Sequence, residues 1–208
     1  MKYINFKKLV SSAVTFSPLD YLPHDHDRNT FGLQISQWKK NGLILPLKRN
    51  LYLLNEDDRK FTPSRLYLAN QMVFPSYVSL ETALSLYGMI PERVYAMTSV
   101  TSKKTKQYSN SFGTFTFRSL QPFRYFGYHV MQDEHKMPVF IADKEKAFLD
   151  FLYFRLPAQK SQNTEILTSF RMENVHDLDR IKLRKYVALF RSRKLSLFMA
   201  AVENKEYL

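Results

Sequence analysis

The chain has 208 residues, a net charge of +12 and 45% hydrophobic residues, and 15% of its residues are aromatic. This length accommodates one or two domains with a sizeable core, and the aromatic content excludes a disordered tail. The positive charge is spread evenly, because the parts 1–60, 61–157 and 158–208 each carry a net charge of +4. We therefore expect the whole molecule, and not one basic arm, to face a polyanion.

The sequence as a whole also indicates where in the cell the protein is expected. The chain has no apolar run of about 18 residues, so neither a transmembrane helix nor a membrane partner is expected. Its first residues lack the apolar core of a signal peptide. It contains no cysteine, which excludes disulfides and zinc fingers and makes the cytoplasm the expected location.

Residues 1–58 predict a head that begins with two short helices. Residues 3–12 place apolar side chains between lysines, which indicates a short helix. Ser17-Pro18 is typical of a helix start, because proline favours the first helical position. Pro23 ends this second helix after one turn.

A longer third helix is predicted next. Phe31, Ile35 and Trp38 recur at spacings of four and three, which places them on one buried face. Its expected N-cap is Asn29 or Thr30, and Gly42 is expected just beyond its end.

A basic hairpin is predicted directly after this helix. The apolar runs 43–47 and 51–54 have the length of strands, and Pro46 confines the first of them to a sheet edge. Lys48, Arg49 and Asn50 suit the tight turn between them, with Asn50 at positive φ. A helix followed by a basic hairpin is typical of a winged helix-turn-helix, whose helix enters the DNA major groove.

Candidate DNA contacts lie on the polar side of the third helix and in the turn. Ser36 and Gln37 are expected at base edges, and Lys40, Lys48 and Arg49 at phosphates, with Arg28, Gln34 and Lys39 as secondary contacts. Leu33 is unusual on such a face. From this helix alone, an ordinary solvated polar surface remains an open alternative.

A mixed domain is predicted over 59–157, after the charged break at 55–60. Helices are expected over 62–73 with Thr62 as N-cap, from Ser79 to Gly88, and over 143–155 with Asp143 as cap. Strands are expected over 94–100, 114–118 and 123–130. The predicted fold class is α+β: a winged helix, a mixed domain with a small antiparallel sheet, and a helical segment over 158–208.

Two features of this domain suggest nucleic acid. Lys103, Lys104 and Lys106 are secondary candidates for phosphate contacts, and a solvated turn is the equal alternative. Phe115 and Phe117 on one predicted strand, and Phe123, Tyr125 and Tyr128 on the next, lie near basic residues and could stack on single-stranded RNA, although strand aromatics are more often core residues.

Catalysis and metal binding are not expected, and no cofactor is predicted. The segment His24-Asp25-His26-Asp27 lacks nearby further ligands, so a solvated loop is the better interpretation. Asp133, Glu134 and Glu145 could suggest a nuclease, but Glu145 and Lys146 are adjacent and so lie on different helix faces. The sequence has no phosphate-binding glycine loop and no serine nucleophile elbow.

The C-terminal part is predicted to be a linker at 157–163 followed by helices over about 178–192 and 195–204. Their apolar faces are flanked by many Arg and Lys residues. A solvated basic face, a DNA-facing surface and a dimer-facing surface all remain open.

Four blocks stand in a specific order and spacing over about residues 30–155. They are Trp38, Gly42-Leu43-Ile44, Leu47-Lys48-Arg49, Tyr52 and Leu54; then SLExAL (79–84), YGxIPExVY (87–95) and TSVT (98–101); then FGTF (112–115) and FGY (126–128); then ADKEKAFLD (142–150). In these blocks the chain resembles the AbiEi family, the antitoxins of type IV, or abortive-infection, toxin–antitoxin systems. Asn50 stands where the family usually has glycine, and asparagine tolerates the same backbone conformation.

The resemblance implies a two-part protein that acts in phage defence. Its winged helix would bind repeats in double-stranded DNA of its own promoter as a transcriptional repressor. The following domain would counteract a nucleotidyltransferase-like toxin without a stable complex. The protein is expected to be a monomer or weak dimer that pairs on DNA. An RNA-binding regulator and a protein-interaction module that holds the toxin directly are the alternatives.

Overall fold

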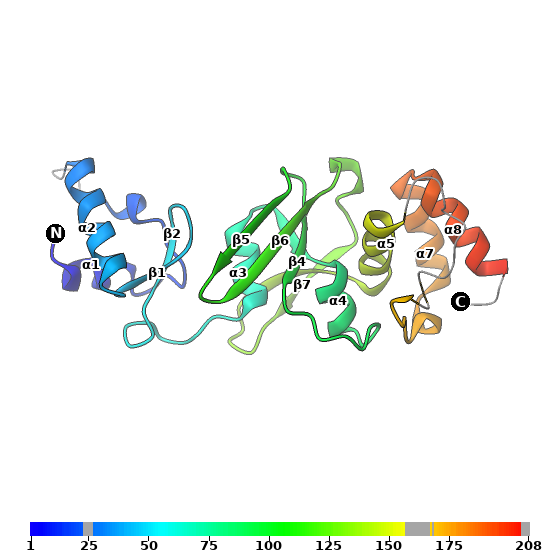
Figure 1. Ribbon diagram of the computed structural model, residues 1–208, viewed down its shortest axis with the longest axis horizontal. Coiled ribbons are helices and arrows are strands. Elements are labelled where there is room, and N and C mark those ends of the chain that lie inside the picture. The colour runs from blue at the N-terminus through cyan, green and yellow to red at the C-terminus, as the bar shows by residue number, and fades with distance from the viewer. Residues whose placement is uncertain (23–26, 157–166, 168, 205–208) are drawn as a thin grey trace.

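The computed structural model describes residues 1–22, 27–156, 167 and 169–204. An N-terminal head, a central sheet and a group of C-terminal helices follow one another along the long axis of the molecule (Figure 1). The head consists of α1 (Tyr3–Val10), the 3-10 helix η1 (Pro18–Tyr21), α2 (Arg28–Lys40), β1 (Ile44–Lys48) and β2 (Leu51–Leu54).

The remaining elements form the centre and the C-terminal end. The centre contains α3 (Arg65–Met72), β3 (Ser76–Val78), α4 (Leu80–Leu86), β4 (Met97–Thr101), β5 (Lys106–Asn110), β6 (Gly113–Ser119), η2 (Pro122–Arg124), β7 (Tyr128–Gln132), β8 (Pro138–Ala142) and α5 (Lys144–Arg155). The C-terminal end contains η3 (Val175–Asp177), α7 (Arg180–Phe190) and α8 (Arg193–Asn204). The predicted α+β class is confirmed. None of the described helices is long and apolar enough to cross a membrane.

The central sheet has six strands in the order β5-β6-β4-β3-β8-β7. The pairs β3–β8 and β4–β6 are parallel, and the other neighbours are antiparallel. The prediction of a small antiparallel sheet is therefore wrong. Local patterns did not reveal β3, β5 and β8, and the parallel pair β3–β8 joins Val78 to Ile141, far along the chain. The strand predicted over 123–130 begins too early, because 122–124 form the 3-10 helix η2 and β7 begins only at Tyr128.

The third helix of the head forms as predicted, but it begins earlier. The Asp27 carboxylate accepts a hydrogen bond from the Thr30 backbone N–H at 2.8 Å, so Asp27 is the N-cap and the prediction of Asn29 or Thr30 is wrong. Gly42 follows the helix with φ +70°, as expected of a residue that ends a helix.

Other helix starts show how tertiary contacts compete with local caps. Ser64, and not the predicted Thr62, caps α3 by accepting from the Tyr67 N–H at 3.2 Å. Ser79 precedes α4, but its hydroxyl donates to the Asp150 carboxylate at 2.9 Å and caps nothing. Asp143 caps α5 as predicted, with its carboxylate 2.9 Å from the Lys146 nitrogen.

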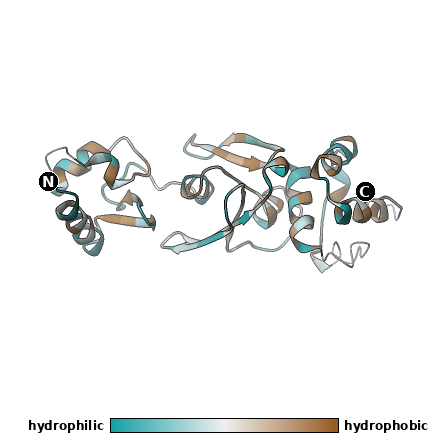
Figure 2. Ribbon diagram, turned by 90° about the horizontal axis from the view of Figure 1, so that it is seen from above, coloured by the Kyte–Doolittle hydropathy of each residue, from teal (hydrophilic) through white to brown (hydrophobic). Residues whose placement is uncertain are grey.

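The described residues form two hydrophobic cores, and the hairpin contributes to both. Phe31, Ile35 and Trp38 of α2 pack in the head core, together with Ile44 of β1 and Leu54 of β2. The adjacent hairpin residues Leu47 and Leu53 belong instead to the central core, which extends into the C-terminal helices. Apolar stretches recur along all three parts of the molecule (Figure 2). Burial on both faces explains why 43–47 and 51–54 are continuous apolar runs.

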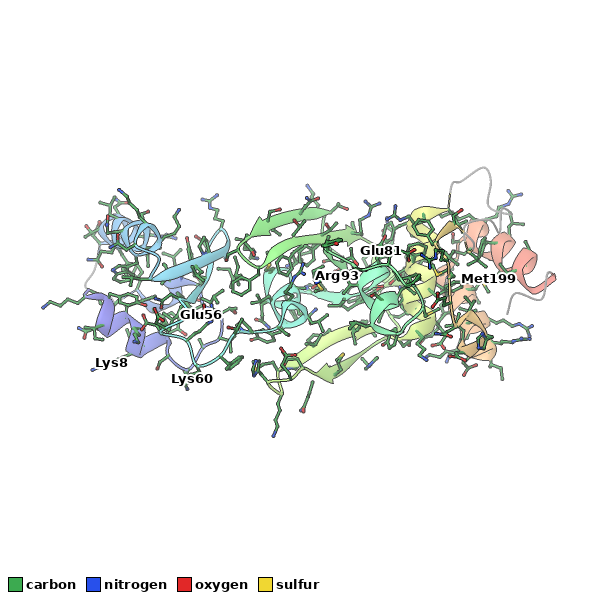
Figure 3. All side chains as sticks on the ribbon, turned by 60° about the horizontal axis from the view of Figure 1, so that its bottom comes forward. Lys8, Glu56, Lys60, Glu81, Arg93 and Met199 are labelled. Atoms are coloured by element: carbon green, nitrogen blue, oxygen red, sulfur yellow. The ribbon has the colours of Figure 1, made fainter. Side chains whose placement is uncertain are left out.

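The charged segment after the hairpin is held against the head. Asp58 accepts a hydrogen bond from the Tyr3 hydroxyl at 2.6 Å and forms an ion pair with Lys7. Glu56 and Lys60 mark this segment between the head and the sheet (Figure 3). The sequence break at 55–60 is therefore a structured junction.

The C-terminal helices pack on α5 through polar contacts as well as the shared core. Lys182 of α7 lies 3.1 Å from an Asp143 oxygen and 2.8 Å from a Glu145 oxygen. Burial opposes the charge of Lys182, but these hydrogen bonds hold its pKa above the ordinary value. Both predicted helices are present, with slightly different ends, and the predicted linker at 157–163 falls on residues outside the described ranges.

Candidate nucleic-acid interface

The polar side of α2 is open to solvent. Its exposed candidate residues are Arg28, Ser36, Gln37, Lys39 and Lys40. All of them belong to the helix whose opposite side is packed in the head core. The face therefore presents hydroxyl, amide and ammonium groups from a rigid backbone.

Leu33 and Gln37 define the centre of this face. Leu33 is 73% exposed, so the unusual apolar residue noted in the sequence lies in water. The Gln37 amide nitrogen donates to the Asn41 side-chain oxygen at 3.0 Å, which orients both amides along the helix. Asn41 is exposed and was not among the predicted contacts.

Gln34 lies apart from these residues. It is half-buried, and its side-chain oxygen accepts a hydrogen bond from the N-terminal amine of Met1 at 3.0 Å. Its helical angle alone did not predict this contact, because Met1 is far from Gln34 in the sequence. Gln34 is thus the most engaged of the α2 candidates.

The hairpin turn presents one exposed cation and one half-buried cation. Arg49 is exposed, and Asn50 has φ +60°, as its position in the turn predicted. Lys48 is half-buried, because β1 packs beside the edge strand β5. There the Asn110 side-chain amide donates to the Leu47 carbonyl at 3.0 Å.

The structure brings the turn together with the lysines of the central domain. Partial burial lowers the pKa of Lys48, and the charges of Lys106 and Lys103 lower it further. Lys103, Lys104 and Lys106 are all exposed. We refer to Lys48, Arg49, Lys103, Lys104 and Lys106 as the tip cluster. The contact between β1 and β5 thus brings Lys48 near Lys103 and Lys106, which are distant from it in the sequence.

Among the aromatic residues considered for RNA stacking, Phe123 and Tyr128 are exposed, but Phe115 and Phe117 are not. Phe115 and Phe117 are fully buried, so the stacking role considered for them is wrong. Their side of β6 faces the core, where Arg65 of α3 lies 5.8 Å from the centre of the Phe115 ring. Alternation along the strand predicted one buried side but not which side.

Two of the three carboxylates considered for a nuclease, Asp133 and Glu145, have other partners. Asp133 accepts from the Ser64 hydroxyl at 2.6 Å and from the backbone nitrogens of His135 and Met137. Glu145 is buried and bonded to Lys182. In the described ranges, no three His, Asp or Glu residues are grouped as metal ligands would be. Residues 24–26 of the His-Asp segment fall outside those ranges.

No protein-family model matches the chain, and a search of curated proteins found no match. The exposed polar residues of α2 and the tip cluster are therefore the features of this chain that bear on its function.

Proposed function

We propose that the chain is a DNA-binding transcriptional regulator whose head is a winged helix-turn-helix. The observation that carries the proposal is the pairing of an open polar α2 face with a basic hairpin turn that continues into Lys103, Lys104 and Lys106. In such a head, the third helix contacts bases in the major groove while the hairpin contacts the adjacent backbone.

The α2 face supplies side chains suited to base edges. An amide such as that of Gln37 can bond in two places to adenine, and the Ser36 hydroxyl can donate or accept. Exposed Leu33 suits the methyl group of thymine, which is the apolar feature of the major groove. Lys40, at the end of the same helix, suits a phosphate.

The tip cluster supplies charge without sequence preference. Each cation that neutralises a phosphate releases counterions, and it steepens the dependence of log K on log salt by about 0.9. Because the cluster spans the head and the central sheet, we expect the DNA to contact both. Burial is the main cause of the lowered pKa of Lys48, and the charges of Lys106 and Lys103 add to it; phosphates would relieve this second effect.

The resemblance to AbiEi antitoxins supports a more specific role. The chain would repress its own promoter at DNA repeats, pairing there as a monomer or weak dimer. The central sheet and the C-terminal helices would counteract a nucleotidyltransferase-like toxin. No catalytic residue or cofactor is needed for either role.

The test is a binding titration with duplex promoter DNA over a series of salt concentrations. The double variant Lys48→Glu/Arg49→Glu should bind at least about tenfold more weakly, and its salt slope should fall by about 2. The matched control Lys8→Glu/Lys60→Glu changes the net charge equally at exposed positions of the head and the junction. It should retain most of the affinity.

An unchanged slope in the turn variant would exclude the hairpin as a DNA contact. Single-stranded RNA measured in the same assay must bind more weakly than the duplex. In cells, the turn variant should lose promoter repression but still protect against the toxin, because the two roles use different parts of the chain. Co-purification of the toxin would favour the alternative of a direct protein complex.

A further inference from the structure

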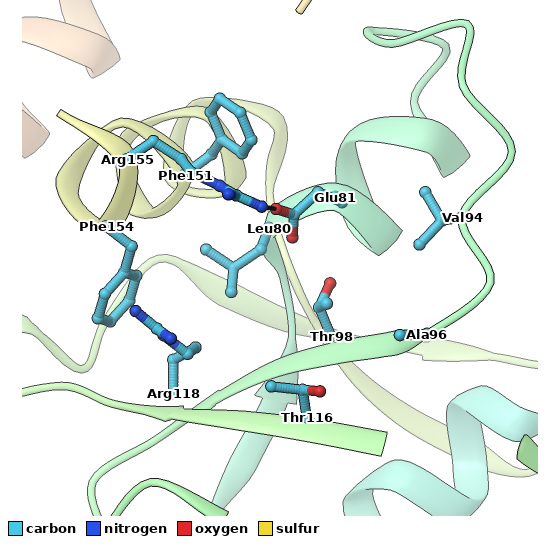
Figure 4. Close-up of a pocket in the computed structure, with 10 residues that line it drawn as sticks. All are labelled: Leu80, Glu81, Val94, Ala96, Thr98, Thr116, Arg118, Phe151, Phe154 and Arg155. Atoms are coloured by element: carbon cyan, nitrogen blue, oxygen red, sulfur yellow. Dashed lines mark hydrogen bonds and ion pairs between the residues drawn. The ribbon is translucent and has the colours of Figure 1, made fainter. Parts of the chain in front are cut away.

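A cavity of about 360 Å³ lies on the central sheet, away from the proposed DNA contacts. It is bounded by β4 and β6 below and by α4 and α5 beside them (Figure 4). This volume falls within the range of about 300–1,000 Å³ that is typical of small-molecule sites. No residue of the α2 face or the tip cluster lines it.

The floor of the cavity is polar. Thr98 of β4 and Thr116 of β6 are register partners, and Arg118 follows Thr116 on the same side of the strand. Thr98 donates to the Ser79 carbonyl at 2.8 Å. The Thr116 hydroxyl makes no hydrogen bond to the described part of the chain. Thr98 and Thr116 are half-buried and Arg118 is exposed, so a molecule in the cavity can reach their polar groups.

The charges around the cavity leave one cation without an acidic partner. Arg155 forms an ion pair with Glu81 across the opening between α5 and α4. Arg118 is exposed, and its guanidinium lies 5.0 Å from the centre of the Phe154 ring. Among the described residues, no carboxylate pairs with Arg118. The lining side chains therefore carry one net positive charge.

The walls are apolar and partly strained. Phe151 is fully buried, and Phe154 stands over Arg118. Leu80 lines the cavity with φ +57°, a left-handed conformation that is rare for a bulky side chain. Such strain persists only where surrounding structure enforces it, and it concentrates at binding sites.

We propose that this cavity binds a small aromatic carboxylate. The planar fork of Arg118 matches a carboxylate in two parallel hydrogen bonds, and the Thr116 hydroxyl can donate a third. The ring of the ligand lies against Leu80 and Phe154. A single negative charge neutralises the single unpaired cation, which favours a carboxylate over a phosphate ester. This activity goes beyond DNA binding and does not depend on it.

The test is a titration of the isotope-labelled full chain with naphthoate. Binding is measured from the shifts of the backbone amide resonances of Thr98, Thr116 and Arg118. Naphthalenemethanol is the neutral analogue, and naphthyl phosphate is the doubly charged one. Naphthoate should bind about tenfold more tightly than the alcohol, because a charge-assisted hydrogen bond is lost in the alcohol. It should also bind more tightly than the phosphate ester.

Arg118→Gln should weaken naphthoate binding about tenfold, and Thr116→Val about fivefold. Arg193→Gln is the matched control, since it removes an exposed guanidinium on α8 outside the cavity. It should leave the affinity unchanged. Well-dispersed amide spectra establish that each variant is folded.

Three outcomes would overturn the proposal. They are an absence of resonance shifts at these three positions at millimolar naphthoate, equal affinity for the wild type and Arg118→Gln, and tighter binding of naphthyl phosphate. A failure of promoter binding would leave this result unaffected, because the two surfaces share no residues.

Discussion

Lys48 shows how a single residue of the proposed DNA surface opposes folding. It is half-buried near Lys103 and Lys106, and burial and their charges lower its pKa below the ordinary 10.5. The unfolded state then binds more protons than the folded state as pH approaches 10.5, so stability rises with pH there. The unfavourable effect of the charge is complete at neutral pH, begins to fall as pH passes the lowered pKa and is gone above 10.5.

We expect Lys48→Met to stabilise the free protein while it weakens DNA binding. The substitution keeps the apolar stem and removes the crowded charge. The gain in the free energy of unfolding should be small, up to about 0.5 kcal/mol at low salt, because solvent screens a half-exposed group. Denaturation at neutral and alkaline pH should show the gain shrinking as pH rises. Lys60→Met, at an exposed position of the junction, is the control, and a loss of stability in Lys48→Met would contradict the explanation.

At the scale of the element, α5 is held by a buried ion pair. Lys146 and Asp150 are both fully buried and pair with each other one turn apart. Asp150 also accepts hydrogen bonds from Tyr77 and Ser79, each at 2.9 Å. Burial lowers the pKa of Lys146 and raises that of Asp150, so each charge is tolerated only because the other is present.

Lys146→Met should destabilise the protein by about 3–5 kcal/mol, because it leaves the Asp150 carboxylate buried without its cation. The double variant Lys146→Met/Asp150→Asn should recover much of this loss. The asparagine removes the charge but keeps an oxygen that accepts from Tyr77 and Ser79. Urea denaturation of the two variants measures the difference. Equal stabilities would show that the pair itself, and not the stranded charge, determines the loss.

At the scale of the whole molecule, the hairpin connects the head to the central domain. Ile44 and Leu54 pack in the head core, while Leu47 and Leu53 pack in the central core. The side-chain amide of Asn110 in β5 donates a hydrogen bond to the Leu47 carbonyl of the same hairpin. The hairpin is therefore packed against both parts of the molecule, as the proposed DNA contacts from the head and the central sheet would require.

Leu47→Ala should destabilise both domains together. The leucine is 2% exposed, and its truncation should cost about 2–5 kcal/mol. Hydrogen exchange should accelerate in the hairpin and also in β5 and α3. Val10→Ala, in the head core alone, is the matched control and should accelerate exchange only in the head. Acceleration confined to the hairpin in Leu47→Ala would contradict coupling through this strand pair.

The sequence by itself determined the features that depend on neighbours along the chain. The spacing of Phe31, Ile35 and Trp38 predicted which side of α2 is buried, and hence that Ser36, Gln37 and Lys40 are exposed. Turn chemistry predicted the positive φ of Asn50. These features follow from helix periodicity and local backbone sterics, which need no knowledge of distant residues.

Only the tertiary structure decided that β3 pairs with β8 and that both faces of the hairpin are buried. It also decided that Lys48 lies near Lys103 and Lys106. It also placed Arg118 and Thr116 beneath α4 and α5. Each of these contacts joins segments that are far apart in the sequence. They arise from the packing of whole elements against one another, which the local pattern of either segment does not specify.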